Sequence, residues 1–416
     1  MWKKFSYIPV EEAHQILIKT VRVETRGEIV PIHEAYNRVL AEDIISDVDI
    51  PPVNISHFDG YAVRAEDTSQ ASINNPVLLR VVSRIYSNEE YKGEVTVGEA
   101  AYISTGCNLP AGANAVIPVE LVKTKGDFIE VRHGIQLYEN VVPTGMDVKI
   151  GEAIFKGGHI LRAQDIKFLV DIKKWRVKVF KRPVVAIASV GSELTNRIEE
   201  TDKKKFNSHG VMISILVGEA GGVPLNLGIA PDDVNAIKRL LREGLGEADI
   251  VVTIGGASVG EKDYVWEAVN QLGTPKVIIR GIKVQPGRVT SLSVVDDKPI
   301  IMLPGHIQST LVGFYSLLLP SIRLMSGLPV TVPYITLKAK ISRKIVVKEF
   351  TPFERVRFVK VTKISEDYIA EPVIGDFSLT SVVVKANGFV VIPEGKEVVE
   401  EGEEVNVFLK GLFPLT

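Results

Sequence analysis

The sequence predicts a multidomain α/β plus β protein whose central part is a doubly wound, mostly parallel α/β domain. Three observations predict this fold class. Apolar strands alternate with helical segments over residues 181–328, short β-rich runs separated by Gly, Pro and Asn fill residues 46–139, and residues 329–416 hold β-rich runs only. A chain of 416 residues has room for several domains of about 150 residues each.

The composition is that of an ordinary globular protein. Hydrophobic residues make up 45% of the chain and charged residues 24%, which excludes wholesale disorder. The formal net charge of −2 predicts no general attraction to nucleic acid or to an anionic membrane. The one cysteine, Cys107, excludes an intrachain disulfide, and with no visible signal peptide we expect a cytoplasmic protein. The longest apolar stretch, 307–325, is interrupted by Pro320 and Arg323, so a buried helix is expected there instead of a membrane span.

The first 180 residues are predicted to form an elongated helical linker domain with a small β domain inserted in it. The linker domain covers residues 1–45 and 140–180, and the inserted domain covers residues 46–139. A helix is predicted at 9–21, because proline and two glutamates open it and apolar residues recur on one side. A second helix is predicted at 162–172. The strands predicted in the inserted domain are 77–82, 94–97, 115–119 and 128–131.

Two further domains are predicted after residue 180. In the α/β domain, residues 181–328, ligands are expected at the carboxyl ends of the strands, as in other parallel sheets. Its predicted strands are 184–188, 223–228, 250–254, 276–280 and 300–303, and its helices are 211–220 and those beginning near Val234, Asp263 and Ile307. The C-terminal domain, residues 329–416, is predicted to be a small barrel or sandwich with strands 335–341, 356–361, 368–374, 388–392 and 404–409.

The segment 248–264 is the strongest local signal in the chain. An apolar strand runs into two adjacent glycines, and a helix is expected to begin at Asp263. Paired glycines let backbone N–H groups approach an anion, and a helix N-terminus adds its positive end. The segment therefore predicts a phosphate-binding loop made of Gly255, Gly256, Ser258 and Gly260. The alternative is a tight turn in which Asp263 only caps the helix.

Three carboxylates follow strands of the same predicted sheet. Glu193 follows the first strand, Asp232 the second and Asp263 the third. Acids that converge at the edge of such a sheet predict a metal site for a phosphorylated ligand. Taken singly, Asp232 could be a helix cap and Glu193 a solvated loop carboxylate.

Other loops of the sheet carry possible anion ligands. Gly305 and Ser309 follow a fourth strand and could donate N–H and hydroxyl groups to an anion, and Arg288 is a permanent cation unless it is merely a surface residue. In the N-terminal half, Asp59 and Thr105 lie in segments that read as turns. The seven histidines have no zinc-ligand spacing, and Cys107 has no obvious histidine partner.

Five segments in the same order resemble the molybdopterin molybdenumtransferase family, which includes MoeA and the gephyrin E-domain. The resemblance covers essentially the whole chain. The segments are LAEDIISDVDIPPVNISHFDGYAV, STGCNLPAGANAVIPVE, ASVGSEL, IGGASVGEKDYV and the tail SVVVKANGFVVIPEGKEVVEEGEEVNVFL.

The resemblance implies an enzyme that inserts molybdate, or tungstate, into adenylated molybdopterin with Mg²⁺-assisted release of AMP. It implies that Glu193, Asp232 and Asp263 serve the metal and nucleotide, and that Arg288 and Ser309 contact the oxometalate. It further implies a homodimer with an active-site cleft shared between subunits, which is completed by the partner's copies of Asp59, Thr105 and Asp147, and a possible contact with molybdopterin adenylyltransferase. The catalytic residues implied are Asp59, Thr105, Asp147, Glu193, Asp232 and Asp263, and the ligand-binding residues are Gly255, Gly256, Ser258, Gly260, Arg288, Gly305 and Ser309.

The chain departs from the family pattern mainly in three loops. Residues 207–209 read Asn-Ser-His where the family has D-S-N, Gln285 replaces the first lysine of K-P-G-K-P, and residues 306–308 read His-Ile-Gln where the family has N-P-V. Phe58 also replaces a methionine, and the arginine-rich stretch before Asp147 is missing. His209 and His306 could restore some positive charge below about pH 6.5. Two other functions therefore remain open: a pterin-binding paralogue without catalysis, and a molybdopterin adenylyltransferase.

Overall fold

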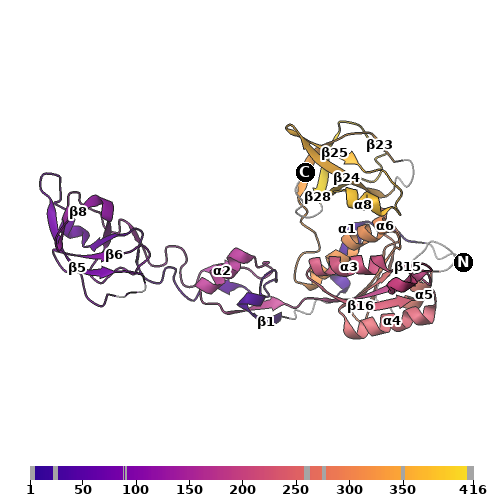
Figure 1. Cartoon of the computed structure of the whole chain (residues 1–416). Helices are drawn as coiled ribbons and strands as arrows, with labels where there is room; N and C mark the ends of the chain where they lie inside the picture. Colours follow the sequence, from indigo (N-terminus) through magenta and orange to yellow (C-terminus); the bar gives the residue numbers. More distant parts are fainter. Residues whose placement is uncertain are drawn as a thin grey trace. The chain divides into compact units, whose positions relative to one another are not determined.

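The computed structural model describes residues 5–21, 27–87, 89, 91–256, 263–273, 278–347 and 352–409. The chain divides into two compact units (Figure 1). One unit combines residues 1–28 with residues 180–416, and the other consists of residues 29–179.

The 29–179 unit contains a six-stranded sheet with the order β7-β4-β6-β5-β9-β8. Its two faces belong to two hydrophobic clusters: Tyr61 and Val63 enter one cluster, whereas Ala62 between them enters the other. This alternation follows from the two-residue period of a strand. The strands are β4 (Gly60–Val63), β5 (Val77–Ile85), β6 (Glu99–Ile103), β7 (Ala115–Pro118), β8 (Val122–Lys125) and β9 (Phe128–Val131).

A separate hydrophobic cluster forms the rest of this unit. Leu40, Leu161 and Leu169 are fully buried in it, and helix α2 (Ala163–Asp171) contributes Leu169. The predicted helix at 162–172 is therefore confirmed within one residue at each end. The short strands here are β1 (Gly27–Pro31), β2 (Ile44–Ile45), β3 (Ile55–Ser56), β10 (Val141–Val142), β11 (Ala153–Phe155) and β12 (Arg176–Phe180), and the 3-10 turns of the unit are Ile32–Glu34, Ala65–Thr68 and Val119–Leu121.

The other unit contains the predicted α/β domain, with a six-stranded sheet of order β16-β13-β17-β21-β20-β18. The first four strands are parallel, and β20 and β18 continue the sheet in antiparallel fashion. The mostly parallel sheet is thus confirmed, but the sequence analysis missed β20. The strands are β13 (Val184–Val190), β16 (Val223–Ala230), β17 (Ile250–Ile254), β18 (Ile278–Arg280), β20 (Ser291–Val295) and β21 (Lys298–Leu303), and two short strands, β14 (Leu194–Thr195) and β15 (Lys205–Phe206), pair beside it.

Helices cover both faces of this sheet. Helices α4 and α5 lie on one face, and α1, α3 and α6 lie on the other (Figure 1). In β13, Val185 and Ile187 face the second group of helices, whereas Ala186 and Val190 face the first. The helices are α1 (Val10–Thr20), α3 (Ser208–Glu219), α4 (Val234–Glu247), α5 (Tyr264–Asn270), α6 (Ile307–Gly313) and α7 (Leu319–Met325), and a π-helical turn, Phe314–Leu318, joins the last two.

The predicted C-terminal β domain is a closed barrel. Strands β24, β25, β22, β28 and β26 follow one another, and a pairing of β24 with β26 closes the ring. A strand of the preceding domain, β19 (Val284–Gln285), adds to the barrel in parallel with β24. The barrel strands are β22 (Thr336–Ile341), β24 (Glu354–Ile364), β25 (Asp367–Pro372), β26 (Gly388–Ile392) and β28 (Glu404–Leu409), and β23 (Ile345–Val346), β27 (Val398–Val399) and helix α8 (Thr380–Lys385) lie outside the ring.

Two details differ from the sequence-based expectation. The predicted strand 94–97 contains only an isolated bridge, between Glu94 and Ala111, and the strand of that region begins instead at Glu99. Helix α8 was not predicted, because its Thr-Ser-Val-Val-Val-Lys sequence is rich in β-branched residues. In the described residues, no helix has both the length and the apolar character that crossing a membrane requires.

Candidate functional site

A cavity of about 860 Å³ opens at the carboxyl ends of β13, β16, β17 and β21. We call it the strand-end cavity. It brings together seven of the residues singled out from the sequence: Glu193, Asp232, Gly255, Gly256, Arg288, Gly305 and Ser309. A cavity at this edge is where ligands of parallel sheets bind.

Two glycines shape the floor of the strand-end cavity. Gly255 and Gly256 both have left-handed backbone angles, with φ of +84° and +68°. A Cβ on Gly255 would lie 2.6 Å from the carbonyl oxygen of Val190, and one on Gly256 would lie 2.6 Å from a methyl carbon of Val265. Only glycine fits such positions, as the sequence indicated. Ser258 and Gly260, the other two predicted residues of this loop, lie outside the described residues.

Asp232 is held at the cavity by the neighbouring loop. Its carboxylate accepts a hydrogen bond from the Ser192 backbone N–H at 3.1 Å, and its own N–H donates to the Ser192 hydroxyl at 3.1 Å. The helix-cap alternative for Asp232 is wrong, because Asp233 caps α4 by accepting from the Ala236 N–H at 2.8 Å. Asp232 therefore stays available to a ligand. Glu193 is an exposed side chain on the same rim.

Asp263 does not join these two carboxylates. Its side chain caps helix α5 by accepting from the Trp266 N–H at 3.1 Å, and it forms an ion pair with Arg280 at 3.2 Å. Both partners of the ion pair are only 11% exposed. In the described part of the chain, no three His, Cys, Asp or Glu residues are grouped so that they could hold a metal ion. Among the described residues that line the strand-end cavity, the carboxylates are Glu193 and Asp232, and Asp263 is not one of them; its predicted part in a three-carboxylate metal site stays a prediction.

Two histidines also line the strand-end cavity. His209 lies in the first turn of α3, behind Asn207, whose side chain caps the helix by accepting from the Gly210 N–H at 3.1 Å. The Nε2 atom of His209 is buried and has no hydrogen-bond partner. Burial, with a smaller effect from His306, lowers the pKa of His209. The expectation that His209 gains charge below about pH 6.5 is therefore corrected toward a lower pH.

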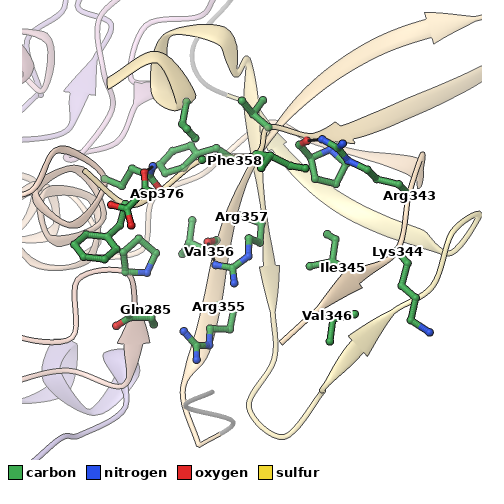
Figure 2. A pocket seen from close by; sticks show the side chains of 18 residues that line it. Gln285, Arg343, Lys344, Ile345, Val346, Arg355, Val356, Arg357, Phe358 and Asp376 are labelled. Carbon is green, nitrogen blue, oxygen red and sulfur yellow. Dashed lines mark hydrogen bonds between the residues drawn. The ribbon is translucent and has the colours of Figure 1, made fainter. Parts of the chain in front are cut away.

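A second cavity, of about 470 Å³, lies between the barrel and the α/β domain (Figure 2). We call it the cation-rich cavity. It is lined by four cationic side chains, Arg343, Lys344, Arg355 and Arg357, and it shares Gln285 and Phe377 with the strand-end cavity. The sequence analysis missed this site. Its signal was the alternation of Arg355 and Arg357 at the start of a predicted strand, which places both on one face.

The contacts of these cations differ. Lys344 is partly neutralised by Glu400, at 2.8 Å, and Arg343 donates to the Pro372 carbonyl. Arg357 donates a long hydrogen bond to the Val356 carbonyl, and burial lowers its pKa. Arg355 is 5% exposed and is paired in register with Gln285, whose side-chain oxygen is buried without a partner. The cavity therefore holds buried positive charge next to a polar group that lacks a hydrogen bond.

The residues predicted in the 29–179 unit are Asp59, Thr105 and Asp147, and the first two are joined by hydrogen bonds. The Asp59 carboxylate accepts hydrogen bonds from the backbone N–H and the hydroxyl of Thr105, at 2.7 and 3.0 Å. Asp59 thus caps the turn after β6, as its turn-like sequence suggested. Asp147 is an exposed residue whose N–H donates to the Ile50 carbonyl at 2.9 Å.

Comparison with known proteins identifies the family. Three family models match: the MoeA N-terminal region (domain I and II) at residues 8–172, the probable molybdopterin binding domain at residues 186–324 and the MoeA C-terminal region (domain IV) at residues 345–410. A molybdopterin biosynthesis protein of Methanocaldococcus jannaschii is 34% identical over 390 residues, which is 91% of each chain. The chain belongs to the MoeA family.

Other MoeA relatives agree with this assignment. The molybdopterin molybdenumtransferase of Staphylococcus aureus is 31% identical and covers 98% of this chain, with 96% of its own length matched. The crystal structure of a molybdopterin biosynthesis MoeA protein from Pyrococcus horikoshii has a TM-score of 0.85 and 33% identity, and covers 98% of this chain and 100% of its own. The resemblance found in the sequence is thus confirmed. Most residues that line the strand-end cavity lie in the part that matches the molybdopterin binding domain, and Phe377 and Ser378 lie in the part that matches the MoeA C-terminal region.

Proposed function

We propose that this chain inserts an oxometalate, molybdate or tungstate, into adenylated molybdopterin and releases AMP. The observation that carries the proposal is the strand-end cavity, in which a two-glycine turn, two carboxylates and Arg288 meet at the edge of a MoeA-type sheet. A phosphoanhydride needs donors for its oxygens and a cation to offset their charge, and this cavity has residues for both.

The nucleotide phosphates are proposed to bind over the glycine turn. Gly255 and Gly256 have no side chains to block the approach of an anion to the backbone. Arg288 and Ser309 line the same cavity and stay proposed as contacts of the oxometalate beside the phosphates. Ser258 and Gly260 are proposed to complete this cradle on the strength of the motif. Gly305 contributes an exposed backbone position beside the turn, since a Cβ there would lie 3.6 Å from the Gly255 Cα.

A Mg²⁺ ion is proposed to bind at Glu193 and Asp232. The donor set fits, because Mg²⁺ commonly takes one or two carboxylates together with phosphate oxygens and waters. When bound, the ion would offset the charge of the phosphoanhydride oxygens. The loop hydrogen bonds from Ser192 orient Asp232 for this purpose. Asp263 is left as a positioning residue for helix α5.

The oxometalate is proposed to enter through the cation-rich cavity. Molybdate and tungstate are tetrahedral dianions of the same charge, and guanidinium groups suit such oxyanions. Arg355 and Arg357 lie on one face of β24 and Gln285 lies beside them (Figure 2). Because Gln285 and Phe377 belong to both cavities, an oxyanion here would lie next to the ligand in the strand-end cavity.

A homodimer is proposed, with Asp59, Thr105 and Asp147 of each subunit serving the cleft of the other. The hydrogen bonds from Thr105 to Asp59 hold two of these residues together at one turn, which supports a common role for them. Mixing an Asp59→Asn variant with an Asp232→Asn variant tests the proposal, since subunit exchange would rebuild one intact site in each mixed dimer. Recovery of activity is expected, and no recovery in exchanged dimers would contradict shared sites. We also propose that the protein is cytoplasmic and that it contacts the molybdopterin adenylyltransferase.

The direct test supplies the full chain with adenylated molybdopterin, Mg²⁺ and either molybdate or tungstate, and follows AMP. AMP release that depends on both Mg²⁺ and the oxometalate is expected. The two oxometalates, run in parallel, show which metal is preferred. Ligand binding without AMP would favour a pterin-binding paralogue, and ATP consumption with molybdopterin would favour an adenylyltransferase.

A further inference from the structure

His209 and His306 line the strand-end cavity and have no part in the function proposed above. Both occur where the chain departs from the family pattern, since each stands at a position that is usually Asn. They come from different elements, because His209 lies in the first turn of α3 and His306 immediately precedes α6. Two imidazoles that line one cavity therefore distinguish this chain from the usual family sequence.

The environment of His209 is unusual for a side chain with an ordinary surface role. Its Nε2 atom is buried without a hydrogen-bond partner, although the ring lines a cavity. An unpartnered buried polar atom is costly unless a ligand or water meets it. His306 is exposed and packs edge-on against Phe377, with ring centroids 4.8 Å apart. The His306 ring is therefore held at the mouth of the cavity.

Charged groups of both signs lie around the two imidazoles. The strand-end cavity presents the carboxylates of Glu193 and Asp232 and the cations of Lys205 and Arg288, and Asp376 interacts electrostatically with His306. Burial and the repulsion from His306 keep the pKa of His209 low, so His209 is neutral near pH 7. A dianion entering the cavity would reverse this balance, because it favours the protonated imidazole.

We propose that His209 and His306 form an anion contact in which the His209 imidazole takes up about one proton from solvent when a tetrahedral dianion enters the strand-end cavity. The free protein holds the proton weakly and the anion-bound protein holds it more tightly. Anion affinity therefore rises as pH falls through the bound-state pKa, and it levels off below the lowered pKa of the free His209. This inference deepens the proposed function, since it rests on that cavity binding the anionic ligand.

The test is calorimetric titration of the full chain, without Mg²⁺, with AMP and separately with molybdate. Each titration is run in two buffers of different ionisation enthalpy, over about pH 6 to 8, where imidazoles titrate. We expect proton uptake by the wild type and a several-fold tighter binding at the acidic end. His209→Asn, which installs the usual family residue, should abolish the uptake, and His306→Asn should reduce it. The AMP and molybdate arms identify which dianion draws the proton.

Matched variants separate this role from a merely structural one. His33→Asn replaces an exposed histidine of the other unit and should leave proton uptake unchanged. His209→Gln keeps an uncharged donor, so it should bind the anion with an affinity that no longer follows pH beyond the titration of AMP itself. Equal proton uptake by the wild type and both His209 variants would overturn the inference. AMP release with no such uptake would refute the inference alone, whereas uptake without AMP release would refute the proposed function alone.

Discussion

The strand-end cavity and the cation-rich cavity share Gln285 and Phe377, yet the charges that line them differ in balance. The strand-end cavity combines a glycine turn with short acidic side chains, which the ends of parallel strands supply. The cation-rich cavity gathers long cationic side chains from a barrel strand and its neighbouring turn. Carboxylates suit a metal-bound phosphate but would repel an oxyanion. The difference lies in the balance of charge: among the described residues, the cation-rich cavity sets four cations against one carboxylate, Asp376, and this balance supports the proposal that it takes the oxyanion.

The largest expected effect tests the carboxylates of the strand-end cavity as metal ligands. Asp232→Asn should lower the AMP release rate at least about 100-fold and weaken its dependence on Mg²⁺, because a proposed metal ligand is lost. The measurement is AMP release across a Mg²⁺ titration. Asp233→Asn is the matched control, since Asn still caps α4 and the cavity keeps its carboxylates. Equal activity of the two variants would show that Asp232 is not needed for the reaction and is not a metal ligand.

The next effect tests the shape of the glycine turn. Gly255→Ala should destabilise the protein by about 2 kcal/mol or more, because the new Cβ meets the Val190 carbonyl in a left-handed backbone. Gly246→Ala, in the exposed last turn of α4 with no atom near its Cβ, should instead be neutral or slightly stabilising. Denaturant unfolding of both variants measures the contrast. A harmless Gly255→Ala would argue against the tight turn.

A smaller effect tests whether the cation-rich cavity binds the oxyanion. Arg357→Gln should raise the KM for molybdate about tenfold, or about 1.4 kcal/mol, while the affinity for AMP changes little. The reason is that Arg357 lines only the cation-rich cavity. Steady-state kinetics and AMP titration separate the two ligands. Lys340→Gln, an exposed barrel substitution on β22, serves as the control. A loss of AMP affinity in Arg357→Gln would instead indicate that AMP and molybdate bind in one common site.

The smallest effect concerns Asp263, which is not among the described residues that line the strand-end cavity. Asp263→Asn should keep AMP release within about twofold of the wild type, because Asn still caps helix α5. It should cost about 1 kcal/mol of stability through the weakened contact with Arg280. Thermal unfolding and the AMP assay measure these outcomes. A large loss of activity in a folded Asp263→Asn protein would indicate that Asp263 is a ligand of the metal ion.

Much of the fold could be predicted because its signals are local. The strands at 250–254 and 128–131 match their predicted bounds. Apolar runs flanked by turn residues predict both of them. Strand β20 was missed although its Ser-Leu-Ser-Val-Val sequence lies directly before the predicted strand at 300–303. Its antiparallel pairing with β21 depends on a hairpin that the alternation of strands and helices does not suggest.

The candidate site was predicted in part for the same reason. Gly255 and Asp232 follow strand ends, so their shared edge could be inferred from the order of elements along the chain. Asp263 also follows a strand, but its partner Arg280 is 17 residues away, and nothing local indicates that pairing. Arg357 was overlooked because its cavity exists only where the barrel packs against Gln285.

The sequence by itself determined the family, the alternation of elements and the glycine turn, because each of these depends on residues close together in the chain. Tertiary structure alone decided which acids share a cavity, which acid pairs with Arg280 and where the cations gather. Those outcomes depend on side chains brought together from distant segments, such as the β19–β24 pairing that places Gln285 beside Arg355. Packing and charge neutralisation, rather than sequence spacing, therefore select the residues left available to a ligand.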